Sequence, residues 1–190
     1  MKKILLFLAI AFSFTLSAQY IHIQEDFNNS TLPAGWTTTA VTGSTAWSFG
    51  IDGALNIAGN NNLDGTALAY FDDDVLGVGQ TNNTAQLVTP TFDNSAYSIT
   101  ILEFDYNFRD LSRPSVTDSF SVQVFDGLNW ITVFSVITND CGNYVGACVG
   151  NFPKATIDIS AYSNANCQLR FTYFDGNDWS WHVGVDNVTV

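Results

Sequence analysis

The sequence predicts an all-β fold, a two-sheet antiparallel β-sandwich, on three observations. Apolar and polar residues alternate with a period of two in short segments along the chain, and no window of helical length carries a 3.6-residue apolar stripe. Asn, Thr, Ser, Asp and Gly dominate the segments between these runs, which is the composition of tight turns. A parallel sheet would need crossover helices, for which the sequence offers no candidate, so antiparallel pairing is expected.

The clearest alternation lies at residues 102–108, where large apolar side chains alternate with Glu103, Asp105 and Asn107. We expect one buried face and one wet face for this strand. Residues 119–124 alternate in the same way, and a turn at 126–129 joins them to the next strand in a predicted hairpin. In all we expect about ten strands. They are predicted at residues 21–27, 46–49, 67–71, 85–88, 102–108, 119–124, 130–134, 155–159, 168–174 and 183–190.

Residues 1–18 have the three parts of a secretory signal peptide. Two lysines follow Met1, an apolar run extends over residues 4–16, and Ser17 and Ala18 supply the small residues of a cleavage site. The apolar run is shorter than the roughly 20 residues that span a bilayer, and no later segment is long and apolar enough, so membrane insertion is not expected. We expect residues 19–190 to form a single domain that is secreted or held at the cell surface, with the periplasm as the other destination.

The charge of the chain excludes two classes of partner. Asp and Glu number 18 against 6 Lys and Arg, which gives a formal net charge of −12. Removal of residues 1–18 takes two lysines away and leaves Arg109, Arg113, Lys154 and Arg170 as the basic residues. Nucleic acid and anionic membrane surfaces repel such a protein, so neither is expected as a partner.

Three cysteines, Cys141, Cys148 and Cys167, enter a compartment that permits disulfides. Cys141 and Cys148 bracket a short loop and are the predicted disulfide pair. Cys167 falls in an apolar alternation and is predicted to be a small buried core residue. Pairing of Cys167 with either loop cysteine is the open alternative. Neither CxxC nor HExxH occurs, so no zinc site is expected.

Segments near the two ends of the chain resemble one family. Residues 25–36 read Glu-Asp-Phe-Asn-Asn-Ser-Thr-Leu-Pro-Ala-Gly-Trp, and residues 184–190 read Gly-Val-Asp-Asn-Val-Thr-Val. Leu-Val-Thr-Pro at 87–90, Leu-Glu-Phe-Asp-Tyr at 102–106 and Trp-Ser-Trp at 179–181 lie between them in the matching order. This series resembles the choice-of-anchor J and cleaved-adhesin domains of secreted bacterial proteins, which are relatives of the MAM-type jelly roll. The resemblance implies a jelly-roll sandwich that serves as an adhesive or accessory module, often with structural calcium.

Calcium is the predicted cofactor, because a hard cation takes six to eight oxygen ligands from carboxylates and carbonyls in loops. In a jelly roll the first and last strands run side by side, which would bring Glu25 and Asp186 together, and a flanking loop would add further aspartates. The alternative is that the three consecutive aspartates form a solvated turn. The candidate ligands are Glu25, Asp26, Asp72, Asp73, Asp74 and Asp186.

Aromatic residues provide the candidate ligand-binding surface. Exposed indoles stack on the apolar faces of sugar rings, but Trp36 and Trp130 fit the buried pattern of the family and are expected to be structural. Trp179 and Trp181 alternate on one face after a polar loop, and Tyr144 lies at the tip of the predicted disulfide loop. We expect these three residues to contact the ligand.

The predicted function is that of a non-catalytic binding or adhesion module that recognises an extracellular glycan or a surface protein. The chain has no GxSxG motif, and neither histidine sits beside a plausible nucleophile in the sequence. A small secreted polysaccharide hydrolase with a pair of aspartates as acid and base is the alternative, and it requires an open cleft with two convergent carboxylates. A structural matrix component is the third possibility.

Overall fold

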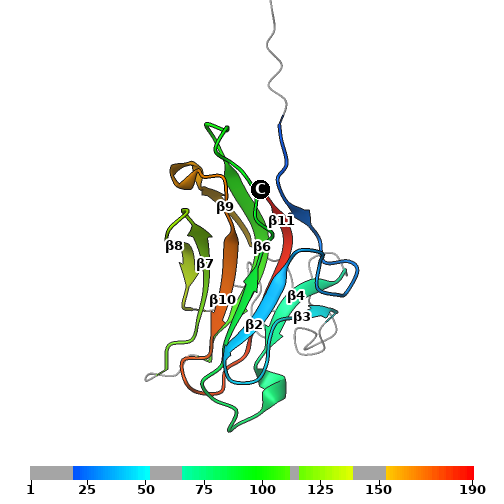
Figure 1. Ribbon diagram of the computed structural model, residues 1–190. Coiled ribbons are helices and arrows are strands. Elements are labelled where there is room, and N and C mark those ends of the chain that lie inside the picture. The colour runs from blue at the N-terminus through cyan, green and yellow to red at the C-terminus, as the bar shows by residue number, and fades with distance from the viewer. Residues whose placement is uncertain (1–18, 52–65, 112–115, 139–152) are drawn as a thin grey trace, which may run out of the picture.

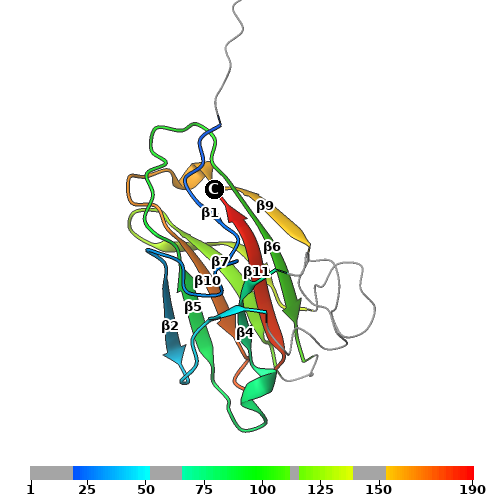
Figure 2. The ribbon, with the colours of Figure 1, turned by 90° about the vertical axis from the view of Figure 1, so that its right-hand side faces the viewer.

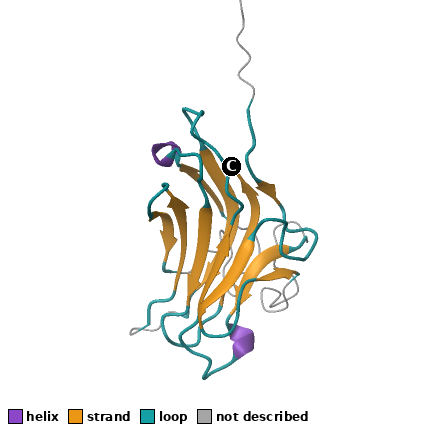
Figure 3. Ribbon diagram, in the orientation of Figure 1, coloured by secondary structure: helices purple, strands orange, loops and turns teal. Residues whose placement is uncertain are grey.

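The computed structural model describes residues 19–51, 66–111, 116–138 and 153–190. Two antiparallel sheets pack face to face, so the predicted all-β sandwich is confirmed (Figures 1 and 3). The strands are β1 (Gln24–Glu25), β2 (Thr37–Thr42), β3 (Ser48–Gly50), β4 (Leu68–Asp72), β5 (Thr84–Val88), β6 (Ile101–Arg109), β7 (Ser119–Phe125), β8 (Trp130–Val136), β9 (Lys154–Asp158), β10 (Leu169–Phe174) and β11 (His182–Thr189).

One sheet has the order β3-β4-β11-β6-β9, with β1 paired to β11, and the other has the order β2-β5-β10-β7-β8. All pairings between these strands are antiparallel. The first and last strands lie side by side, with Gln24 opposite Thr189 and Glu25 opposite Val188 (Figure 2). This adjacency is the feature that the resemblance to a jelly roll predicts.

The core lies between the two sheets and consists largely of aromatic rings. Phe104 from β6 meets Phe171 from β10 edge to face at 5.5 Å, and Phe120 from β7 stacks on Phe171 at 6.5 Å. All three side chains have no exposed surface. Burying a large aromatic or aliphatic side chain contributes roughly 1.5–3 kcal/mol. The alternation read from the sequence therefore places the right residues in the core.

The polar side of β6 differs from the expectation of a wet face. Asp105 and Asn107 are buried, and each has a partner on β11. The Asn187 amide donates to Asp105 at 3.0 Å, and Asn107 Oδ1 lies 3.0 Å from His182 Nε2. Since β6 and β11 are both interior strands of their sheet, their outward polar groups satisfy one another instead of water.

Two strands at the edges differ from the sequence-based expectation. Strand β2 was not predicted, because its sequence Thr-Thr-Thr-Ala-Val-Thr has no apolar alternation. It is an edge strand whose residues are exposed or half-buried. The strand is therefore stabilised by the β propensity of its β-branched residues and by its pairing with β5, and not by burial in the core. Strand β1 spans two residues of the predicted segment 21–27.

Helical structure in the described residues is limited to two single-turn 3₁₀ helices, η1 (Asp74–Leu76) and η2 (Ser160–Tyr162). Within the described ranges, no helix has the length and apolar character needed to cross a membrane. Helix η1 lies at the end of the sandwich opposite the C-terminus (Figures 1 and 3).

Cys167 is a free, fully buried thiol, as its place in the apolar alternation predicts. Burial raises the pKa of this thiol to about 11. It therefore stays protonated and packs as a small apolar group. Cys141 and Cys148, the predicted disulfide pair, lie outside the described residues.

Candidate functional site

Two tryptophans and an arginine form an aromatic surface at the end of the sandwich that carries η1. Trp179 and Trp181 are half-buried, and their ring centroids lie 5.4 Å apart at an angle of 50°. The Arg109 guanidinium lies 3.8 Å from the centre of the Trp181 ring, a cation–π contact. We call Trp179, Trp181 and Arg109 the tryptophan platform. It comes from the loop between β10 and β11 and from the last residue of β6.

Backbone hydrogen bonds fasten the platform loop to the chain that follows β4. The carbonyl of Trp181 accepts from the amides of Asp73 and Asp74 at 2.8 and 3.1 Å. In return, the Ser180 amide donates to the Asp73 carboxylate at 2.5 Å, and the Trp179 indole donates weakly to the Asp74 carbonyl at 3.4 Å. Both loops are therefore held together, and the two indoles have a fixed support.

Three buried carboxylates lie beneath the platform. Asp73, Asp118 and Asp175 are each at most 2% exposed. Asn83 bridges two of them, because its side-chain amide donates to Asp73 at 3.1 Å and its backbone amide donates to Asp175 at 2.6 Å. The Ser180 hydroxyl donates to Asp118, so each carboxylate contacts either Asn83 or Ser180.

Burial is the main cause of the raised pKa values of these three carboxyl groups. It raises the pKa of Asp73 to about 7, and the nearby charges of Asp175 and Asp118 act in the same direction. Burial also raises the pKa of Asp118 and of Asp175. The same burial, together with the charge of Asp73, raises the pKa of the Tyr173 phenol, which keeps it protonated. The group therefore retains protons to higher pH than solvent-exposed aspartates do.

A hydrolase would need its acid and base to reach a substrate. Asp73, Asp118 and Asp175 have raised pKa values, but the platform loop covers them and little or none of their surface is open to solvent. Their positions fit a role in holding the loop. They do not form the open cleft with two convergent carboxylates that the hydrolase alternative requires.

The structure divides the predicted calcium ligands between two places. Asp72 pairs with His182 in the β-ladder, whereas Glu25 pairs with Val188, six residues farther along β11. At about 3.4 Å per residue this separation is about 20 Å, so one ion cannot contact both groups. The expectation that a flanking loop brings Asp72, Asp73 and Asp74 to Glu25 and Asp186 is therefore wrong. In the described part of the chain, no three acidic, histidine or cysteine side chains converge on a point that could hold a metal.

Glu25 and Asp26 instead line a recess beside the last strand. Its volume is about 440 Å³ and polar groups predominate in it. Glu25 accepts a hydrogen bond from the Phe27 amide at 2.8 Å, and Asp186 accepts one from the Asn187 amide at 2.7 Å. The lining residues are Gln24, Glu25, Asp26, Asn29, Asn187 and Thr189.

Part of the candidate site was predicted from the sequence and part was missed. Trp179 and Trp181 lie side by side, as their alternation indicated. Tyr144 lies outside the described residues. Arg109, Asp118 and Asp175 were missed, because they are brought to the platform from separate strand ends and no local motif joins them.

The fold defines a class: this jelly-roll sandwich is the architecture of cleaved adhesin domains and of several carbohydrate-binding modules. The K1 cleaved adhesin domain of Lys-gingipain from Porphyromonas gingivalis W83 is similar over 88% of this chain and 95% of its own, with 20% identity and a TM-score of 0.64. The resemblance to cleaved adhesins predicted from the sequence is thus confirmed at the level of the fold.

Two carbohydrate-binding modules share the same fold. CBM27-1 from Caldicellulosiruptor saccharolyticus, solved in complex with mannohexaose, is 15% identical, with a TM-score of 0.55 over 88% of this chain and 95% of its own. TmCBM61, solved with β-1,4-galactotriose, is 9% identical, with a TM-score of 0.55 over 90% and 97% of the two chains. The sequence itself matches no protein-family model and no protein with a curated description.

Proposed function

We propose that this protein is a non-catalytic, exported binding module that attaches to a glycan through the tryptophan platform. The observation that carries the proposal is the pair of partly exposed indoles, 5.4 Å apart, on a loop held by buried hydrogen bonds. Aromatic faces pack against the C–H groups of sugar rings, and the Arg109 guanidinium supplies hydrogen-bond donors at the edge.

The rigid support beneath the indoles favours binding. A ligand that meets a preformed surface does not have to order a loop, and this saves part of the entropic cost of association. Ser180, between the two tryptophans, is fully buried and bonded to Asp73 and Asp118, so the loop cannot rotate its indoles away without breaking those contacts. The fold shared with the K1 adhesin domain and with modules solved in complex with oligosaccharides supports the same function.

Titration calorimetry with mannohexaose and β-1,4-galactotriose, followed by a glycan array, tests the proposal. We expect Trp179→Ala and Trp181→Ala each to weaken binding by about tenfold, which is about 1.4 kcal/mol. Trp130→Ala is the matched control, because Trp130 is also half-buried under an arginine, with Arg170 at 4.3 Å, but lies on β8 of the other sheet. Binding that both platform variants retain would contradict the proposal. Release of reducing ends from either oligosaccharide would favour the hydrolase alternative.

Calcium enters the proposal as a structural ion at the recess beside β11. Glu25 and Asp26 supply carboxylate oxygens there, and Asn29 and Asn187 supply amide oxygens, which is the mixed hard-oxygen set that calcium prefers. A bound ion would join β1 to the last strand and stabilise the N-terminal edge. We expect calcium to raise the melting temperature and EDTA to reverse the rise. Glu25→Gln should abolish this effect, and Asp74→Asn, at the opposite end of β11, should preserve it.

A further inference from the structure

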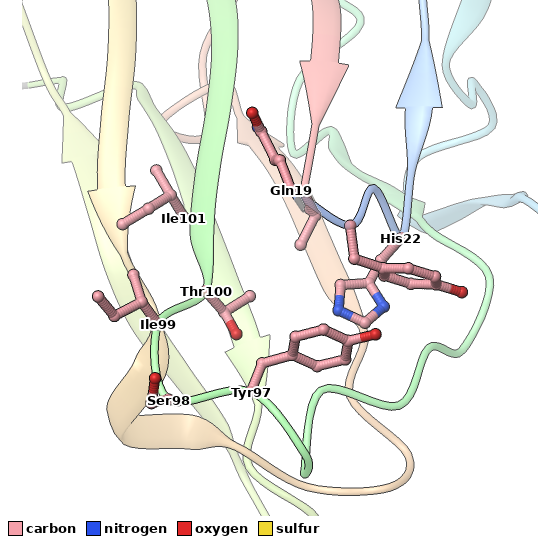
Figure 4. A pocket seen from close by; sticks show the side chains of 9 residues that line it. Gln19, His22, Tyr97, Ser98, Ile99, Thr100 and Ile101 are labelled. Atoms are coloured by element: carbon pink, nitrogen blue, oxygen red, sulfur yellow. The ribbon is translucent and has the colours of Figure 1, made fainter. Parts of the chain in front are cut away.

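A second hollow lies at the end of the sandwich opposite the tryptophan platform. There the segment at residues 19–22 meets Val190 (Figure 4). Its volume is about 410 Å³, within the range of about 300–1,000 Å³ that small-molecule sites occupy. The segment at residues 19–22, the loop and strand start at 97–101 and Val190 form its walls. The tryptophan platform precedes β11 and the hollow lies at its far end, so a strand of eight residues, about 27 Å, separates them.

Three rings dominate one wall of the hollow. Tyr20 stacks on Tyr97 with centroids 5.3 Å apart, and His22 meets each of them edge to face at 4.8 Å. Tyr20 and Tyr97 are 59% and 36% exposed, although their rings are large and apolar. The backbone amide of His22 is fixed to the Val190 carbonyl at 2.7 Å, so the rings stand on paired backbone. Solvent-exposed aromatic surface on such a support is typical of a ligand site.

A buried hydroxyl without a partner also lines the hollow. Thr100 is 4% exposed, and its Oγ1 makes no hydrogen bond to any part of the chain that the structure describes. Its backbone is fully engaged, because its amide donates to the Ser160 hydroxyl at 2.8 Å and its carbonyl accepts from the Ile159 amide at 2.9 Å. An unpartnered buried hydroxyl destabilises the free protein, and a ligand hydroxyl that reached it would relieve that cost.

Among the described residues that line the hollow, none has an acidic or basic side chain apart from His22. Burial lowers the pKa of His22, so its ring is neutral at pH 7 and offers one donor and one acceptor. The overall charge of −12 repels anions. A neutral ligand with apolar faces and hydroxyl edges therefore fits this hollow better than an anionic one.

We propose that the hollow lined by Tyr20, His22, Tyr97 and Thr100 is a second binding site, which takes a single neutral sugar ring. The ring lies against the tyrosine faces, and one of its hydroxyls bonds to Thr100 Oγ1. Together with the platform, this site would let one domain contact glycans at both ends.

Saturation-transfer NMR tests the site with the methyl β-glycosides of glucose, galactose and mannose and with methyl β-D-glucuronide. We expect transfer to at least one neutral glycoside and none to the glucuronide, which differs from the glucoside only at C6. In ¹⁵N spectra the shifted signals should fall in residues 19–22 and 97–101. Tyr97→Ala should weaken binding by about tenfold. Thr100→Val, which keeps the shape and loses only the hydroxyl, should weaken it by about threefold to tenfold without lowering the melting temperature.

The same NMR experiments with the Trp179→Ala/Trp181→Ala double variant distinguish binding at the hollow from binding at the platform. A signal that persists there belongs to the hollow, whether or not the platform binds glycan. The proposal is overturned if no neutral glycoside binds, if binding disappears in that background, or if Tyr97→Ala and Thr100→Val both bind normally. Sedimentation that reveals a dimer broken by Tyr97→Ala would assign the aromatic wall to a second copy of the chain and would also overturn it.

Discussion

The two ends of the sandwich display aromatic rings on different foundations. At one end Trp179 and Trp181 rest on buried carboxylates that bind the loop through Ser180 and Asn83. At the other end Tyr20 and Tyr97 rest on His22 and on backbone pairing between the two ends of the domain. The first surface depends on a polar network inside the protein, and the second depends on contacts near its surface.

This difference predicts how each end responds to change. A buried network fails as a unit, because each group that loses a partner becomes an unsatisfied buried group. A half-exposed ring can be removed with little effect on folding, because water replaces it. Substitutions beneath the platform should therefore reduce stability, and substitutions in the hollow should reduce binding alone.

The largest effect is expected from Asp73→Ala. It removes the acceptor of the Ser180 amide and one of the two acceptors of the Asn83 side-chain amide, which also donates to the Gln80 carbonyl at 3.2 Å. We expect the free energy of unfolding to fall by about 2–4 kcal/mol. Urea unfolding followed by tryptophan fluorescence measures it. Asp73→Asn keeps one acceptor oxygen in place and should cost less than half as much. Equal losses in the two variants would show that the network does not hold the loop.

A smaller loss is expected from Gly176→Ala in the platform loop. Gly176 has a φ of 72°, and an added Cβ would lie 2.6 Å from Val116 Cγ1 and 2.9 Å from the Asp118 amide nitrogen. We expect a loss of about 1–3 kcal/mol from backbone strain and crowding together. Gly77→Ala is the matched control, since Gly77 has a φ of 78° with no atom within 4 Å of the added Cβ. The difference between the two melting temperatures measures the crowding of the added Cβ against Val116 and Asp118. Identical shifts would show that this crowding does not contribute to the loss.

The pH dependence of stability should distinguish the two ends next. The pKa of Asp73 is raised from 3.8 to about 7 in the folded protein, so the folded state binds this proton more tightly than the unfolded state does. The stability gained from the proton is fully present below about pH 4 and is lost as the pH rises to about 7. Burial lowers the pKa of His182 to about 3, so this group has the opposite effect: it lowers the stability of the folded protein as the pH falls from 6.5 to 3. The stability difference between the wild type and Asp73→Asn removes this second effect, because His182 is common to both.

That difference should therefore favour the wild type most at pH 4 and shrink by pH 8. Chemical unfolding at half-unit pH steps measures it. A difference that stays constant from pH 4 to pH 8 would mean that Asp73 does not change its protonation within that range. Tyr97→Ala leaves Asp73 and its hydrogen bonds unchanged, so between pH 6.5 and 8, above the range in which burial of His22 affects stability, its pH profile should run parallel to that of the wild type.

The sequence predicted the fold well because a sandwich of this kind is encoded locally. Alternation at residues 102–108 and 119–124 places Phe104 and Phe120 in the core without knowledge of any partner strand. Strand β2 escaped prediction because an edge strand needs no buried face. Asp105 and Asn107 were expected to be wet because a sequence does not reveal that their strand lies beside β11 and that His182 and Asn187 face them.

The sites were less predictable because their parts are separated along the chain. Trp179 and Trp181 share a strand-like alternation, and this local signal was sufficient. Asp118 and Asp175 come from different loops, and they meet Asp73 only because β4 and β10 end, and β7 begins, at the same end of the sandwich. Thr100 gives no sequence signal, since its importance comes from one unpaired hydroxyl.

The smallest effect on stability is expected at the hollow. Tyr20→Ala and Tyr97→Ala remove rings that are 59% and 36% exposed, and each should lower the free energy of unfolding by less than about 1 kcal/mol. Urea unfolding of both variants beside Asp73→Ala provides the comparison. A loss at Tyr97 as large as that at Asp73 would place this ring in the structural core and would make the wall of the hollow a part of folding. A small loss would show that the exposed tyrosine rings contribute little to the stability of the fold, as expected of side chains that contact a ligand.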